Sequence, residues 1–172
     1  MKKFLFFLIF SLSFIFSFAT TQQELSEVAV KFLKDKDFSP KIENNVISWM
    51  NSGSYNEIQI VPANNLFIIQ IGSSLNRTFE KPKSKDFSDK LLVMSQLIQS
   101  EVPLIRLSLS SIKGGDLASL KGGNPEDIAG YSCNCNIQNL ISDSKMFQEI
   151  LPLFYDYITI IPDKIKEIVE TL

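Results

Sequence analysis

The stretch YSCNCNIQNLISDSKMFQEILPLFYDYITIIPDKIKEIVETL, residues 131–172, decides the fold of this chain. Its first ten positions, Tyr131 to Leu140, alternate between a polar side and an apolar side that holds Tyr131, Cys133, Cys135 and Ile137. A period of two with one polar face is typical of an antiparallel sheet that is wetted on one side. From Phe147 to Leu172 apolar residues recur every three or four positions, which predicts an amphipathic helix. Pro162 should kink this helix or begin a new one.

The same two periods continue towards the N-terminus. Thr21 and Glu24 have the spacing of a capping box, and apolar residues up to Leu33 then fall on one helix face. We expect strands over residues 42–50, 55–61 and 66–71, joined by short turns that force antiparallel neighbours. A polar linker over 72–84, a helix over 85–100 and a strand over 103–111 follow. The predicted fold is α+β, with an antiparallel five-stranded sheet in the element order α-β-β-β-α-β-β-α.

The composition excludes several kinds of chemistry. The chain has 172 residues and no histidine, so it holds no Ser-His-Asp or Cys-His catalytic set and no His-ligated metal. A net charge of -2 argues against a nucleic-acid partner, which needs a basic patch. The motifs indicate neither a cofactor nor a metal site, and we expect none.

The N-terminus has the pattern of an export signal. Two lysines precede an apolar run from Phe4 to Phe18, and Ala19 supplies the small residue of a cleavage site. The run is shorter than the roughly 20 residues of a membrane-spanning helix. We therefore expect a signal peptide over 1–19 and one domain over 20–172, with no membrane span after cleavage; an uncleaved anchor is the alternative. The predicted location is the periplasm or the extracellular space, or the secretory pathway in a eukaryote.

Cys133 and Cys135 are the most reactive side chains left once histidine is excluded. Residues i and i+2 of a strand point the same way, here towards the apolar side. Buried free thiols that serve packing are favoured, because an exported protein normally oxidises exposed ones. Two alternatives stay open: a disulfide, whose Cα separation would lie at the upper limit of the allowed range, and a redox or metal site.

Other short motifs each have an ordinary structural interpretation. The loop motif KGGD at 113–116 recurs as KGGN at 121–124 and indicates a flexible connection, an anion cradle or a partner-binding element. SDSK at 142–145 matches the S-x-x-K motif, yet its place at a helix start favours capping. The acidic pair Glu126-Asp127 alone does not define carboxylate catalysis. Asn76 begins a glycosylation sequon whose use depends on the organism.

A family resemblance rests on three parts of the chain. The segment LLVMSQLIQSEVPLIRLSL, residues 91–109, is a helix that feeds an alternating strand. Together with the N-terminal helix and meander and with residues 131–172, it resembles the YbjN family over most of residues 22–172. That family is similar in fold to the chaperones that escort type III secretion effectors. The resemblance implies a twisted antiparallel sheet with helices packed on one side, and protein binding or regulation, often as a dimer, without catalysis.

These observations favour an exported, non-enzymatic module that binds a partner protein or acts as a chaperone. A small secreted hydrolase that uses carboxylates and a homodimeric envelope protein joined through the last helix are the alternatives. The candidate partner-binding residues lie on the polar side of the last two predicted strands and in the loop between them: Ser108, Ser110, Asn134, Asn136, Gln138, Lys113 and Lys121.

Overall fold

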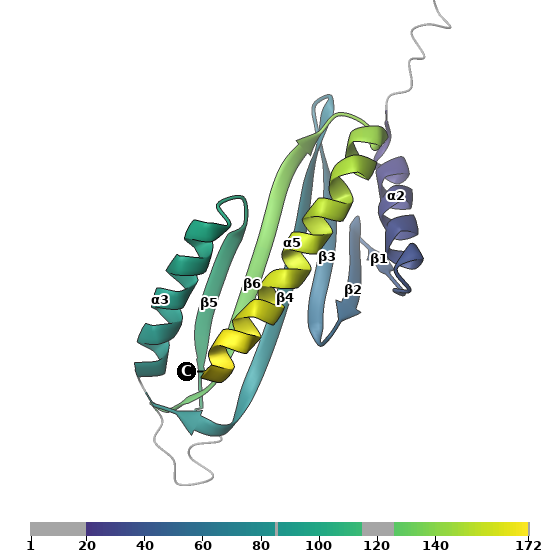
Figure 1. Ribbon diagram of the computed structural model, residues 1–172. Helices are drawn as coiled ribbons and strands as arrows, with labels where there is room; N and C mark the ends of the chain where they lie inside the picture. The colour runs from purple at the N-terminus through teal and green to yellow at the C-terminus, as the bar shows by residue number, and fades with distance from the viewer. Residues whose placement is uncertain (1–19, 85, 115–125, 172) are drawn as a thin grey trace, which may run out of the picture.

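The computed structural model describes residues 20–84, 86–114 and 126–171, which form three helices and a six-stranded antiparallel sheet (Figure 1). The strand order across the sheet is β1-β2-β3-β4-β6-β5. The predicted signal peptide lies outside the described residues. In chain order the elements are α2 (Gln22–Asp35), β1 (Lys41–Glu43), β2 (Val46–Asn51), β3 (Ser54–Ala63), β4 (Leu66–Lys83), α3 (Asp86–Glu101), β5 (Arg106–Lys113), β6 (Ile128–Ile141) and α5 (Ser144–Thr171).

The predicted α+β class is confirmed, but the prediction of five strands is wrong. The segment expected as one strand over 42–50 is a hairpin, in which β1 pairs with β2. Asn44 and Asn45 form its turn with φ of 49° and 65°. Two-residue hairpin turns need positive φ at both central residues, and asparagine tolerates that conformation better than most residues.

The prediction of a polar linker over 72–84 is also wrong, because β4 continues through this segment to Lys83. This strand pairs with β3 over its first half and with β6 along most of its length. Its second half alternates as a half-buried strand should: Leu75 is buried while Asn76 and Thr78 are exposed. The sequence from Gly72 to Ser74 and the charged residues beyond it hid this alternation.

All three helices cover the same face of the sheet, as Figure 1 shows for α2 and α5. Alternate residues of the strands, such as Ile58, Ile71 and Ile137, are buried beneath them. At the β5 edge, Ser88 of α3 donates a hydrogen bond to Ser111 over 2.9 Å. Gln99 holds the other end of α3, since its side chain bonds the backbone of Ile105 and of Leu107. The opposite face of the sheet is therefore left open.

The first and last helices begin as the sequence predicts. At α2, Thr21 and Glu24 form both hydrogen bonds of the capping box. At α5, the Asp143 carboxylate accepts from the Met146 N–H over 2.9 Å, which confirms capping at the S-x-x-K motif. This bond, together with one from the Ser142 hydroxyl, lowers the pKa of Asp143. Among the described residues, no helix has both the length and the hydrophobicity needed to cross a membrane.

The last helix runs from Ser144 to Thr171 without interruption and contains Pro152 and Pro162. Of the two alternatives expected at Pro162, a kink or a new helix start, the new start is not observed, and this proline is itself buried. The helix packs along β6 and β4 and meets α2 near its own beginning (Figure 1). Phe32 of α2 and Tyr155 of α5 form an edge-to-face pair with ring centroids 5.4 Å apart. The first and last helices thus close the core together.

Candidate functional site

The open face of the sheet, defined here as the face that no described helix covers, gathers most of the predicted partner-binding residues. Ser108 of β5 lies opposite Asn134 of β6, and Ser110 lies opposite Ser132. Asn136 and Gln138 continue the same side of β6. Because paired residues project from the same face, these hydroxyl and amide side chains form one continuous polar surface.

The open face also contains residues that the sequence analysis missed. A hollow of about 360 Å³ lies at its centre, and strands β3 and β4 supply most of its wall. One register row places Glu57, Gly72 and Asn136 side by side. The hollow is lined by these three residues and by Tyr55, Gln70, Ser74 and Asn134, among others.

Gly72 creates the hollow because it leaves a gap in the row between Glu57 and Asn136. A Cβ atom built at Gly72 would lie 3.5 Å from the Cys135 carbonyl oxygen and 3.7 Å from Cβ of Asn136. These are ordinary van der Waals distances, so the backbone does not require glycine here. The missing side chain instead leaves room above a central strand.

The chemistry of the hollow suits recognition of neutral polar groups. The amides of Gln70, Asn134 and Asn136 each offer a donor and an acceptor, which is what a polypeptide backbone also needs. Glu57 is the one ionisable carboxylate among the lining residues. Paired-carboxylate hydrolysis requires a second acid across the substrate, and the hollow does not provide one.

Apolar side chains border this polar centre on the open face. Met50 and Tyr55 are paired across β2 and β3, and they are 60% and 44% exposed. Beyond the opposite end of the hollow, Val61 and Leu140 both lie in the register row of Ile68 and are 40% and 52% exposed. A polar centre flanked by exposed Met, Tyr and aliphatic side chains has the composition of a protein-binding surface.

The thiol side chains of the two cysteines take no part in this surface, although the backbone of Cys135 borders the hollow. Cys133 and Cys135 are free and buried under the helices, which confirms the packing alternative over the disulfide. Burial raises the pKa of both thiols to about 12. A thiol that stays protonated at neutral pH is a poor nucleophile and a poor metal ligand. Within the described ranges, no three Cys, Asp or Glu side chains converge as a metal site.

The remaining candidate residues lie apart from the hollow. Lys113 is exposed at the end of β5. Lys121 lies outside the described residues, as do the Gly-Gly motifs apart from Gly114. Asn76 is exposed on β4, opposite Ser132 of β6, so the sequon is part of a strand. The structure therefore brings five of the seven predicted residues onto one face and separates Lys113 from the hollow.

Comparisons with known proteins add no relative: no protein-family model, no curated protein and no solved structure matches this chain.

Proposed function

We propose that the chain is an exported, non-enzymatic module that binds a partner protein on the open face of its sheet. The observation that carries the proposal is the hollow around Gly72, on a face that no described helix covers. Sheets normally bury one face and solvate the other, so polarity alone would not indicate a site. An ordinary solvated sheet face does not need a hollow at a glycine with exposed apolar residues on both sides, whereas a protein-binding surface does combine a polar centre with such residues.

Three further points support the parts of this proposal. Both cysteine thiols are buried and protonated, and a single carboxylate lines the hollow, so nucleophilic or paired-acid catalysis has no support there. The leader-like sequence over 1–19 supports export. The resemblance to the YbjN family implies protein binding or chaperone activity and stays part of the proposal.

Site-specific photo-crosslinking tests the proposal and captures the partner in the same step. A photoreactive amino acid replaces Asn136 on the open face, or Glu149 on the exposed side of α5, and crosslinks are formed in the exporting cell. We expect a discrete crosslinked protein from position 136 only. Gly72→Phe should abolish that crosslink by filling the hollow, whereas Gly72→Ala should retain it. Equal crosslinking from both positions, or no effect of Gly72→Phe, would contradict the proposal.

A homodimer is a second candidate, because α5 carries a second apolar stripe on its outer side. Leu153, Tyr157 and Ile160 are 59%, 46% and 48% exposed and follow helical spacing. Exposed contiguous apolar surface on a helix favours association. Light scattering at rising concentration should then show a dimer that Tyr157→Glu disrupts. A monomer at every concentration would exclude this candidate and leave the open-face proposal intact.

A further inference from the structure

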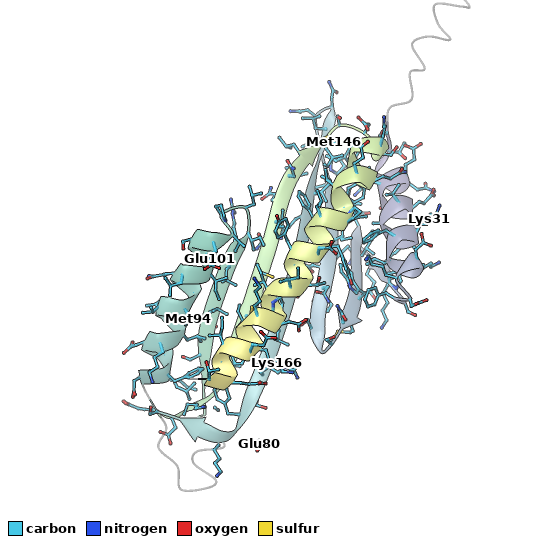
Figure 2. All side chains as sticks on the ribbon, viewed as in Figure 1. Lys31, Glu80, Met94, Glu101, Met146 and Lys166 are labelled. Atoms are coloured by element: carbon cyan, nitrogen blue, oxygen red, sulfur yellow. The ribbon has the colours of Figure 1, made fainter. Side chains whose placement is uncertain are left out.

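A second cavity, on the helix-covered side of the sheet, carries an inference separate from the open face. Its volume is about 290 Å³, and it lies between the second half of β4, the start of β6 and the last turns of α5. Figure 2 labels Lys166 on this part of α5. Pockets for drug-sized ligands begin at about 300 Å³, so this β4–α5 cavity suits a small ligand.

Positive charge dominates the lining of the β4–α5 cavity. Arg77, Lys83 and Lys166 line it, against one carboxylate, Glu170. Among the described residues, none of these three cations has a carboxylate within ion-pair distance. Lys83 instead lies over the Phe79 ring, with its ammonium 5.7 Å from the centroid. The cavity therefore holds an excess of two positive charges that no described side chain neutralises.

Two buried hydrogen-bond donors at the cavity have no partner in the described structure. They are Nε of Arg77 and the hydroxyl of Tyr131. Buried polar groups are nearly always hydrogen-bonded, so each unpartnered group asks for an explanation. Tyr131 is only 2% exposed, and its burial raises the pKa of the phenol, which keeps the hydroxyl a donor. Both residues line the cavity, so a bound acceptor would satisfy both groups after a small movement of the side chains that now seal them from solvent.

The guanidinium of Arg77 is already held in place for such a ligand. Its Nη2 donates to the Ser52 carbonyl oxygen in the β2–β3 turn over 3.1 Å. This bond fixes one edge of the guanidinium plane, while Nε is left without a partner. A fixed arginine fork costs less entropy when it binds an oxyanion than a mobile one does.

We propose that the β4–α5 cavity binds a phosphoryl dianion, either inorganic phosphate or the phosphate of a small monoester. Arg77 Nε and the Tyr131 hydroxyl donate to its oxygens, and Lys83 and Lys166 balance its charge. A dianion matches the two excess positive charges, and tetrahedral oxygens can meet donors that come from β4, β6 and α5 at once. A single carboxylate would leave one charge and at least one donor unmatched.

Nuclear magnetic resonance of the purified protein tests the proposal through the side-chain Nε–H signal of Arg77. Inorganic phosphate and O-phosphoserine are titrated separately at constant ionic strength, with acetate and chloride as monoanion controls. We expect a saturable shift of this signal at micromolar to millimolar phosphate, and none with acetate. If only phosphoserine shifts the signal, the ligand is a monoester; if both do, free phosphate suffices. No shift with either one, or an equal shift with acetate, overturns the proposal.

Matched variants separate a built site from general surface charge. Lys166→Gln removes a lining cation, and Lys164→Gln removes the same charge from a neighbouring exposed position of α5 that does not line the cavity. Tyr131→Phe removes only the unpartnered hydroxyl and should not unfold the chain. Tyr131→Phe and Lys166→Gln should each weaken phosphate binding at least about tenfold, since hydrogen bonds to charged groups are the stronger kind. Equal affinity in Lys166→Gln and Lys164→Gln, or full affinity in Tyr131→Phe, contradicts the proposal.

Discussion

Two glycines in adjacent central strands should respond in opposite ways to the same substitution. Gly72 lies in β4 and Gly130 in β6. A Cβ atom at Gly130 would overlap the Arg77 carbonyl oxygen and lie 3.0 Å from Cα of Thr78. These are backbone atoms of the paired strand, which cannot rotate away. At Gly72 the closest atom to an added Cβ is 3.5 Å away, so alanine fits without movement.

The cost of Gly130→Ala follows from what must move to accept the methyl group. Strand β4 has to separate from β6 beside the pairs Arg77–Tyr131 and Thr78–Gly130, next to the register shift that follows Thr78. Loss of about two ladder hydrogen bonds there costs about 2 kcal/mol, and the crowding itself costs about 1–3 kcal/mol. We expect Gly130→Ala to lower the free energy of unfolding by about 3–5 kcal/mol. Gly72→Ala should raise it by roughly 0.5 kcal/mol, because alanine restricts the unfolded chain.

Urea unfolding measured by tryptophan fluorescence checks both values. The chain has one tryptophan, and Trp49 is buried against Tyr155, with ring centroids 6.3 Å apart. The urea concentration at the midpoint should fall sharply for Gly130→Ala, while the slope of the unfolding free energy against urea concentration (the m-value) stays unchanged. For Gly130→Ala, a free energy of unfolding within about 0.5 kcal/mol of the parent would refute the reasoning, because surface-like substitutions stay in that range. Equal losses at the two glycines would refute it as well.

Three further predictions concern a turn, the thiols and a helix cap. Asn45→Gly should stabilise the β1–β2 hairpin, and Asn45→Val should cost about 1–2 kcal/mol of unfolding free energy, because φ is 65° there; similar midpoints in urea would contradict this. Cys133 and Cys135 should resist thiol reagents until urea is added, and rapid labelling of the native protein would show accessible thiols. The free energy of unfolding should fall as pH rises above 9.0, because the thiols of the unfolded chain ionise there while those of the folded protein ionise only near 12. The Met146 N–H and then the Ser142 hydroxyl hold the pKa of Asp143 below 3.8, so its contribution to stability is present above that pH and lost as pH falls through the folded pKa. In acid titrations by circular dichroism, Asp143→Asn should lose this dependence, and an unchanged acid transition would count against the cap.

The sequence predicted those elements whose local signals agree with their packing. The capping box at Thr21, the cap at Asp143 and the apolar stripe of α5 are all local features, and all three are observed. Two of the errors, the missed hairpin and the predicted linker, came from places where a local signal is ambiguous. Asn44-Asn45 lacks the glycine of the strongest hairpin signal, Asn-Gly, so the local pattern predicts one continuous strand although both residues have positive φ. Residues 72–84 are polar on both sides of β4, because Asn76 and Thr78 lie on the open face while Ser73 is buried and Arg77 lines the β4–α5 cavity, and such polarity fits a linker equally well.

Only part of the candidate site could be predicted from the sequence, because only that part depends on local patterns. The β5 and β6 residues of the open face alternate cleanly, so Ser108, Asn134 and Asn136 could be placed on one polar side. Glu57 and Gly72 complete the hollow only because β4 lies between β3 and β6 in the sheet. A sequence without this long-range pairing does not reveal which strands are neighbours. The β4–α5 cavity was hidden likewise, since its residues are separated by about half of the chain.

The contact between α2 and α5 has a consequence for how the protein is made. Phe32 and Tyr155 join the two ends of the domain, so a growing chain cannot seal its core until translation has passed the last helix. Domains whose contacts are this remote in sequence fold late and slowly. If residues 1–19 direct export, as we propose, the delay keeps the nascent polypeptide loose enough to thread through a translocation pore. A chain truncated after Ile141 should accordingly be digested by protease as fast as an unfolded polypeptide, and resistance would show that folding begins earlier.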